Sequence, residues 1–587
     1  MTISRPEYPR PQLQRTDWLN LNGEWHFDTD PNNVGLAEKW YQSHVYSARI
    51  QVPFTMNSTA SGVSHLAPCD RVWYAREFRV PTDWRTQQLL LHLGACDHRT
   101  SVYINGELAG AHIGGYSPFY FDIAHLIKPG VNTVTLRVLD SPSWTQPRGK
   151  QAGTTRWPID YDPIIGPWQT IWLEPVESLH ASRIWTTYSL ANRLLSVNIS
   201  LSKMASGKLE FILSDNGVNI ARHEATFADR PEVKFDLQLH DPALWSPESP
   251  YLYDLQLTIK DAAGNRVDHC SSYTGLREIS IQHRELRLNG SPLYLRGVLD
   301  QGYFPNGWYT AEHDADLRRD VELTLAMGFN CARKHQKAED PRYLYWADKL
   351  GLLVWAEMPS GRIFSTELIE TLSAEWTQLV QRDRGHPSVI TWVPFNESWG
   401  VWHQAERPAQ RAFVDAITRL TQALDPSRPV VGNDGWEYSS GDLWTLHLYE
   451  TETESIAERL AELLQNPSLE VVDRRVGVLP DADVSRLPVL LTECGGIGFS
   501  HKPVANHFAY GDLPADEAAL RARFQTIANE IHQAAGLSGF VWTQLTDVQQ
   551  EINGMLHFDR TPKLPLTDVR LIMLGIGPVE ADESVNS

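Results

Sequence analysis

Hydrophobic and polar residues alternate along short segments in the first part of the chain. Val72–Val80, Gln88–Leu93 and Thr100–Ile104 are such segments, and turn-forming residues separate them. Alternation of this kind is typical of strands with one buried face. Asn105-Gly106 follows the third segment, and Asn-Gly between two such runs strongly indicates a hairpin. The pattern predicts an all-β sandwich over residues 1–180.

The same alternation continues through residues 181–280. Leu195–Leu201 and Leu252–Ile259 are further expected strands. A β segment of about 100 residues has the size of an immunoglobulin-like sandwich. We therefore expect a second β domain over residues 181–280.

The pattern changes after residue 281, where apolar strands alternate with amphipathic helices. The expected strands are 293–299, 329–333, 352–357, 389–395, 429–432, 443–448, 488–492 and 539–544. Eight strands, most with a helix between them, predict a C-terminal (β/α)8 TIM barrel over residues 281–587 rather than an open sheet. The active site is then expected at the carboxyl ends of these strands.

Two glutamates follow strands of the expected barrel. Glu397 follows the fourth strand and Glu493 ends the seventh, so both carboxylates are expected at the same rim. Paired carboxylates are the groups that glycosidases use on a glycosidic bond. A separation of about 5–5.5 Å gives a retaining enzyme, and about 6.5–9.5 Å an inverting one.

Composition excludes several other classes of protein. The net charge of −20 argues against nucleic acid and anionic membranes as partners. Five cysteines without C-x-x-C spacing fit reduced thiols, and no apolar leader or membrane span is visible, so a cytoplasmic location is expected. Without an H-E-x-x-H motif or a Gly-rich phosphate loop, we expect neither a metal nor a cofactor. A homo-oligomer is left open.

The motifs around the two glutamates resemble those of glycoside hydrolase family 2. Gly385–Trp392 leads to Asn396-Glu397, and Thr492 precedes Glu493, as in the acid/base and nucleophile signatures of that family. The resemblance extends over nearly the whole chain, through Leu21–Phe27, Gly114–Phe119, Gly166–Trp172, Leu244–Tyr253 and Gly275–Arg277. It implies a sugar-binding jelly roll, an immunoglobulin-like sandwich and a catalytic barrel.

The resemblance also implies roles for site residues. Glu397 would be the general acid/base and Glu493 the nucleophile of a retaining mechanism. Asn396 would bind the sugar 2-hydroxyl, and Arg333 would hydrogen-bond the nucleophile and keep it ionised. A strand-end glutamate or arginine that only forms an ion pair is the structural alternative.

Three further residues match positions of the family. His447 and Tyr449 resemble a His-x-Tyr element whose tyrosine hydroxyl contacts the nucleophile. Trp542, on the last strand, is placed like the tryptophan that floors the sugar subsite. For His447 and Trp542, the alternative is a buried structural side chain.

Departures from the family pattern concern the residues that would read the sugar. Leu299–Tyr303 replaces an Asn-Arg-His element, and Arg333–Pro341 replaces Arg-x-Ser-His-Tyr-Pro. The resulting candidates for substrate binding, each of which could instead form an ion pair, are Asp300, Lys334, His335 and Glu339.

A further departure bears on uronic acid substrates. Glucuronidases of the family grip the uronate with an Asn-x-Lys element, whereas Glu551-Ile-Asn553 has no lysine. An acid there would repel a uronate unless Lys334 or Lys337 substitutes. Glu551 and Asp547 are better suited to hydroxyl groups.

The sequence thus predicts an exo-acting retaining glycoside hydrolase that removes a terminal sugar from a small oligosaccharide or glycoconjugate. A β-galactoside is the first expectation, followed by a β-galactofuranoside or an α-L-arabinofuranoside. A β-glucuronide is disfavoured. The alternatives are a non-catalytic carbohydrate-binding protein and a transglycosylase.

Overall fold

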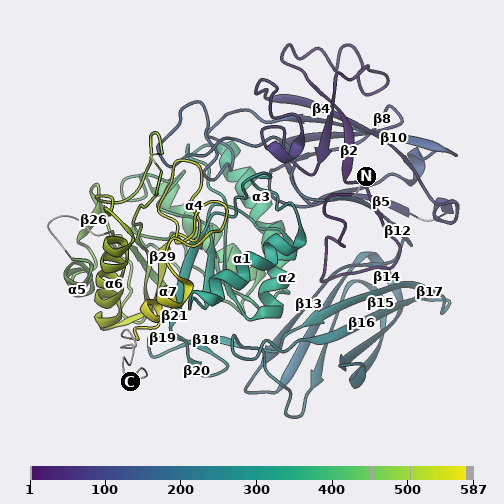
Figure 1. Cartoon of the computed structure of the whole chain (residues 1–587). Helices are drawn as coiled ribbons and strands as arrows, with labels where there is room; N and C mark the ends of the chain where they lie inside the picture. The colour runs from purple at the N-terminus through teal and green to yellow at the C-terminus, as the bar shows by residue number, and fades with distance from the viewer. Residues whose placement is uncertain (1–2, 87, 450–454, 503, 577–587) are drawn as a thin grey trace, which may run out of the picture.

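The computed structural model describes residues 3–86, 88–449, 455–502 and 504–576. Two β domains lie beside a helix-covered barrel (Figure 1). The expected fold class, a jelly roll, a sandwich and a TIM barrel, is confirmed.

The N-terminal domain is built from two main sheets with an apolar core between them. The larger sheet, in spatial order, contains β3 (Ala48–Val52), β2 (Gly23–Thr29), β4 (Arg71–Arg79), β10 (Val131–Leu139), β7 (Arg99–Ile104) and β8 (Glu107–Ile113). The smaller contains β1 (Leu19–Asn20), β12 (Ile171–Val176), β5 (Gln88–Leu93) and β9 (Phe119–Asp122). A short pair, β6 (Cys96–Asp97) and β11 (Gly166–Pro167), completes the strands of this domain.

The predicted hairpin is confirmed between β7 and β8. Asn105 and Gly106 have φ values of 53° and 84°. Two consecutive residues with positive φ make the turn that matches strand twist, and Asn-Gly adopts it at low cost.

The middle domain is a five-stranded antiparallel sheet that curves around its own core. Its strands are β13 (Ala181–Ser189), β14 (Leu194–Asp215), β15 (Val218–Gln238), β16 (Tyr253–Asp261) and β17 (Arg266–Thr274). Val197, Phe211 and Leu255 belong to its buried cluster. The three small strands that follow, leading to the barrel, are β18 (Ile279–Gln282), β19 (Glu285–Leu288) and β20 (Ser291–Pro292).

The barrel has a seven-stranded parallel sheet. In spatial order it contains β24 (Val389–Val393), β23 (Leu353–Glu357), β22 (Cys331–Lys334), β21 (Leu295–Asp300), β29 (Leu537–Thr543), β28 (Val489–Gly495) and β25 (Trp444–His447). The helices around it are α1 (Asp314–Ala326), α2 (Pro341–Leu350), α3 (Thr366–Asp383), α4 (Pro408–Leu424), α5 (Ile456–Gln465), α6 (Glu517–Gln533) and α7 (Leu566–Met573). A small hairpin, β26 (Glu470–Val472) with β27 (Arg475–Val476), lies after α5.

The expected fifth strand is not formed as a strand. The segment still lies beside β24, where Val430 makes an isolated parallel bridge with Trp392. Pro429 has no N–H to donate, which interrupts the ladder. A second bridge, Asn396 with Asp434, continues the contact toward the rim. Beside β24 this segment is therefore held by isolated bridges rather than a regular ladder, and toward β25 the His447 N–H donates to the Gly435 carbonyl at 3.2 Å.

The N-terminal domain is fixed to the barrel by buried polar contacts. Glu375 of α3 accepts hydrogen bonds from the backbone N–H groups of Tyr116 and Ser117 at 2.8 and 3.0 Å. Burial raises the pKa of Glu375 to about 7. Lys150 lies 3.0 Å from Glu551 beyond β29. These contacts hold a jelly-roll loop over the carboxyl ends of the strands.

In the part of the chain that the structure describes, no helix is both long and apolar enough to cross a membrane.

Candidate active site

Glu397 lies on a tight turn after β24. Glu397 and Ser398 have φ values of 52° and 58°, a left-handed conformation that non-glycine residues rarely adopt. Hydrogen bonds fix this turn, from Glu397 N–H to the Asp434 carbonyl at 2.9 Å and from Ser398 N–H to Asn433 Oδ1 at 2.9 Å. Backbone strain of this kind is typical of functional sites that need one exact side-chain position.

Glu493, on β28, lies on the opposite side of the same opening. Arg333 Nη1 is 3.0 Å from Glu493 Oε1, and the Tyr449 hydroxyl donates to Oε2 at 2.6 Å. Both carboxylate oxygens of Glu493 are thus held. Tyr449 stacks on Tyr510 with ring centroids 3.5 Å apart, which fixes the tyrosine.

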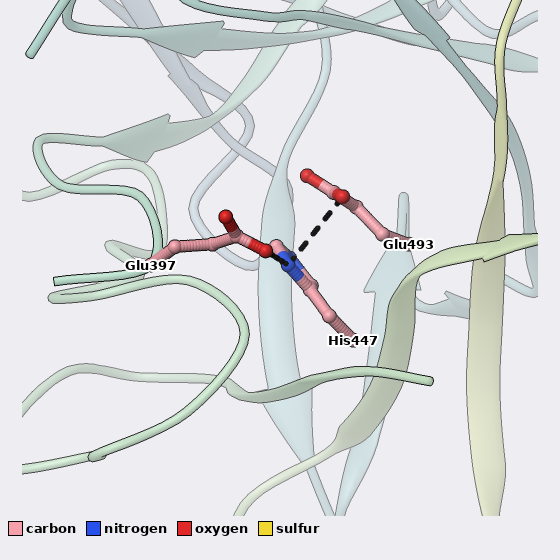
Figure 2. A group of neighbouring side chains, drawn as sticks. All are labelled: Glu397, His447 and Glu493. Carbon is pink, nitrogen blue, oxygen red and sulfur yellow. Dashed lines mark hydrogen bonds and ion pairs between the residues drawn. The ribbon is translucent and has the colours of Figure 1, made fainter. Parts of the chain in front are cut away.

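The two carboxylates face each other across His447. Figure 2 shows the imidazole between them, with Nδ1 2.8 Å from Glu397 Oε1 and 3.6 Å from Glu493 Oε2. One oxygen of each glutamate and this imidazole nitrogen all lie within 4.8 Å of one another. The glutamates that the sequence separates are therefore brought together, as predicted.

The environment gives the two carboxyl groups different acidities. Burial and the nearby negative charge of Glu493 raise the pKa of Glu397. Burial alone would raise the pKa of Glu493 too, but His447 and Arg333 offset it and lower that pKa. Burial likewise disfavours charge on His447, yet Glu493 and Asp434 raise its pKa to about 10. Glu397 is therefore the better proton donor, and Glu493 the better anion.

Arg333 is the centre of the buried network below the carboxylates. It is fully buried on β22 and contacts Glu493, Glu357 at 2.7 Å and Asp434 at 2.8 Å. Its Nη2 also donates to Asn396 Oδ1 at 2.6 Å. Because the amide group is planar, the contact to its oxygen also fixes the direction of Nδ2, which has no partner among the described residues. Asn396 therefore has a free donor beside the acid.

His335 also lies at this network. It is buried, with Nδ1 3.0 Å from Glu357 Oε1. Burial and the charge of Arg333 lower the pKa of His335 well below its usual value, so the ring is neutral. His335 is thus placed beside the residues that hold Glu493.

Sequence reasoning missed Glu357, Asp434 and Thr543. Glu357 ends β23, Asp434 follows the fifth barrel segment, and Thr543 ends β29. Asp434 lies 3.3 Å from His447 Nε2, and the Thr543 hydroxyl lies 3.0 Å from the hydroxyl of Tyr449. Each is a polar residue at a strand end, the same signal that identified Glu397.

Asp300 and Glu339 are not placed to read a sugar, and these predictions are corrected. Lys334 Nζ lies 2.6 Å from Asp300 and 2.7 Å from Glu339, and it covers the ring of Tyr343 in α2 at 4.3 Å. Successive side chains of a strand point to opposite faces. Because Arg333 points into the barrel, Lys334 points outward toward the helices. Asp300 and Glu339 form ion pairs with Lys334 on this outer side.

Trp542 is not placed as a sugar platform, which corrects a second prediction. The indole is 1% exposed and packs against Phe524 of α6, with centroids 4.7 Å apart. It belongs to the apolar layer between strand and helix. Strand alternation turns its neighbour Thr543 toward the site instead.

Glu551 is buried at the rim, but its charge is compensated. It accepts hydrogen bonds from Lys150 at 3.0 Å and from the Tyr161 hydroxyl, both in the N-terminal domain. Asn553 donates to its other oxygen at 3.3 Å. Burial raises the pKa of Tyr510 well above its usual value, and Glu493, Glu397 and Glu551 raise it further, in keeping with a place for Glu551 near the same opening.

Glu397, His447 and Glu493 could in principle ligate a divalent cation. Glu493, however, is already bound by a guanidinium and a phenol, and His447 bridges to Asp434. A cation would have to compete with the positive charge of Arg333. The arrangement suits proton transfer between organic groups better than metal binding.

Comparison with known proteins gives consistent matches along the chain. Models of glycosyl hydrolases family 2 match in order: the sugar binding domain over residues 19–148, a further family 2 model over 179–277, and the TIM barrel domain over 279–471. A β-glucuronidase of Paenibacillus borealis is 25% identical over 463 residues, covering 72% of this chain and 74% of the relative.

Two other similar proteins agree with these matches. A β-galactosidase of Thermoanaerobacter pseudethanolicus is 26% identical over 71% of this chain, which spans only 54% of that longer relative. The solved β-glucuronidase of Ruminococcus gnavus in complex with D-glucuronic acid aligns with a TM-score of 0.79 at 22% identity, covering 98% of this chain and 100% of the other. This last likeness is one of fold.

Proposed function

The chain belongs to glycosyl hydrolases family 2, and from this premise we propose that it is an exo-acting, retaining glycosidase for a neutral terminal sugar. The observation that carries the proposal is the short distance between the carboxylates of Glu397 and Glu493, with oxygens within 4.8 Å. Oxygens this close support the carboxyl separation of about 5–5.5 Å that retaining enzymes have, and so favour direct attack by one carboxylate over the water-mediated attack of an inverting mechanism.

The first step forms a covalent intermediate. The Glu493 carboxylate attacks the anomeric carbon as the glycosidic C–O bond breaks, and Glu397 gives its proton to the leaving oxygen. A lowered pKa on Glu493 and a raised pKa on Glu397 suit these two roles. The product is a glycosyl ester of Glu493 and a free alcohol.

The second step returns the enzyme to its starting state. Once Glu493 is an ester, its negative charge no longer opposes ionisation of Glu397, so the Glu397 carboxylate can take a proton from water. The oxygen of that water attacks the anomeric carbon, and the ester bond breaks with Glu493 leaving as a carboxylate. Two inversions give net retention.

Neighbouring residues support the charged states of this cycle. Asn396, with its free Nδ2, is proposed to donate to the sugar 2-hydroxyl in the transition state. Arg333 and Tyr449 hold Glu493 in position for attack. Because Glu493 is already held in position, its attack on the anomeric carbon has a smaller entropic contribution to the activation free energy.

The charges near the opening favour a neutral sugar over a uronic acid. Lys150 is already paired with Glu551, at 3.0 Å. Lys334 and Lys337 are paired with Glu339, at 2.7 and 2.9 Å, on the outer face of the barrel wall. None of these lysines is free to bind a carboxylate. A β-galactoside is our first assignment, with a β-galactofuranoside or an α-L-arabinofuranoside as the second.

A panel of aryl glycosides tests the proposal. It contains galactopyranoside, galactofuranoside, arabinofuranoside, mannoside and glucuronide, each assayed with the wild type and with Glu493→Ala. We expect a neutral glycoside to be the best substrate and the variant to lose about 10³-fold or more in kcat/KM. A glucuronide as best substrate would overturn the sugar assignment. Equal kcat/KM in Glu493→Ala and the wild type would overturn the assignment of Glu493 as the nucleophile.

The same panel separates the alternatives. A carbohydrate-binding protein without catalysis would turn over no member. A transglycosylase would transfer the glycosyl group to an added sugar acceptor faster than to water.

A further inference from the structure

A second cavity lies away from the catalytic carboxylates, where all three domains meet. It has a volume of about 160 Å³ and is lined by residues of the jelly roll, the middle sandwich and the barrel helices. For comparison, an engineered protein cavity of about 150 Å³ binds one benzene molecule. The site therefore accepts one six-membered ring. No residue that we place in the active site lines it.

Four residues that line this cavity carry buried side-chain donors without partners in the described part of the chain. Gln169 and Trp172 are 4% and 3% exposed, yet Gln169 Nε2 and Trp172 Nε1 have no acceptor among the described residues. Arg10 Nε and Arg382 Nη1 likewise have no hydrogen-bond acceptor among the described residues. A buried donor without an acceptor is costly, and most such donors in proteins are satisfied. Four donors at one cavity point to a ligand rich in acceptor oxygens.

The charge at the cavity favours an anionic ligand. Arg10 and Arg382 remain paired with Glu174 and Asp383, at 2.9 and 2.6 Å. Arg183, at the exposed side of the cavity, makes no ion pair within the described ranges. Its guanidinium is free to bind a carboxylate in a bidentate manner.

Aromatic rings form one wall of the cavity. His92 stacks on Trp172 with centroids 4.6 Å apart, and Tyr120 lies 5.3 Å from His92. Tyr120 is 53% exposed, so much of its ring surface is open. Flat aromatic surfaces bind the apolar faces of ring molecules while polar groups at the edge set orientation.

We propose that this cavity is a second binding site, distinct from the active site, for a small acidic sugar of hexuronate size. The carboxylate binds Arg183, the ring lies against Tyr120, and the hydroxyl and ring oxygens accept from Gln169 and Trp172. Such a ligand contacts all three domains at once and so stabilises their arrangement. This inference goes beyond the proposed function and does not depend on it.

Titration calorimetry on the full chain tests the proposal, with D-glucuronate as the probe and D-glucose as the neutral comparison. We expect D-glucuronate to bind at least ten-fold more tightly than D-glucose. Arg183→Ala, a surface change that should not disturb folding, and Gln169→Leu should each weaken D-glucuronate at least five-fold. Arg222→Ala, which removes an exposed arginine elsewhere on the middle sandwich, should leave binding unchanged. None of these variants should change kcat/KM on the aryl glycoside.

Two results would overturn the inference. One is equal affinity for D-glucuronate in the wild type, Arg183→Ala and Gln169→Leu, which places any bound sugar elsewhere. The other is equal affinity of the wild type for D-glucose and D-glucuronate, which would show that the site does not select an acidic ligand. If no glycoside is hydrolysed but D-glucuronate binds and the two variants weaken it, the proposed function fails and this inference stands.

Discussion

His447 Nδ1 lies 2.8 Å from Glu397 Oε1, which joins the expected acid to an imidazole whose pKa is raised to about 10. The same nitrogen is 3.6 Å from Glu493. A cationic ring between two carboxylates lowers the pKa of each of them. On Glu397, burial and the charge of Glu493 outweigh this effect, whereas on Glu493 the ring acts together with Arg333. His447 thus helps to keep Glu493 ionised.

Replacement of His447 tests this role. His447→Gln removes the positive charge but keeps a polar side chain, so the pKa of Glu493 should rise. Since activity requires the Glu493 carboxylate, the acidic limb of the kcat/KM profile should move to higher pH, with a loss of about 10²-fold at the optimum. His403→Gln, at a half-exposed surface histidine, is the control. An unmoved acidic limb would contradict the electrostatic role.

Glu397 should control the alkaline limb. Activity requires its protonated form in the first step, so kcat/KM should fall as pH rises through the raised pKa of Glu397. It should also fall as pH drops through the lowered pKa of Glu493, and the two apparent values belong to the coupled pair. In Glu397→Ala the alkaline limb of the profile should disappear. The rate on glycosides with poor leaving groups should fall by about 10²–10⁴-fold.

Azide provides a sharper readout for the same variant. With an aryl glycoside that has a good leaving group, azide should restore turnover of Glu397→Ala and give a glycosyl azide, because this anion needs no general base. Failure of azide to accelerate the variant would remove Glu397 from the acid/base role.

Arg333 should matter for stability as well as catalysis. Arg333→Met leaves Glu357, Asp434 and Glu493 buried together without their shared cation. Breaking a buried ion pair costs about 3–5 kcal/mol, so a comparable loss in the free energy of unfolding is expected from denaturant titration. Arg318→Ala, in an exposed pair with Glu322, should cost no more than about 1 kcal/mol. Similar losses in both variants would contradict the account.

Lys150 should anchor the N-terminal domain to the barrel rim. Lys150→Met leaves Glu551 buried without a cation, and a loss of about 3 kcal/mol or more in stability is expected. Adding Glu551→Gln should recover much of this loss, because the uncompensated charge is gone. A double variant no more stable than the single one would show that the ion pair is not the anchor.

Much of the fold could be predicted from local patterns. Strand alternation, the Asn105-Gly106 turn and the strand–helix repeat each follow from backbone geometry that neighbouring residues determine. The fifth barrel strand was predicted in full but forms only bridges, because Pro429 cannot donate to the ladder. Such interruptions depend on which segments pair in the folded sheet, and local sequence patterns do not show this pairing.

The candidate site was predictable where a residue ends a strand on the inner face. Glu493, near the end of β28, follows this rule, and Glu397 lies on the turn just beyond β24. Lys334 and Trp542 did not, because a shift of one position along a strand reverses the direction of the side chain. Asp434 was missed because the strand before it is irregular. Pairing of Glu551 with Lys150 could not be predicted, because it joins domains about 400 residues apart in the chain, and no local pattern reports such a contact.

The anomeric configuration of the first-formed sugar is the most direct test of the paired-carboxylate mechanism. Proton NMR should follow hydrolysis of the best aryl glycoside from the panel, before mutarotation mixes the anomers. The account predicts that the free sugar first appears with the same anomeric configuration as the substrate. A product that first appears with the opposite configuration would contradict attack by Glu493 and require an inverting reaction.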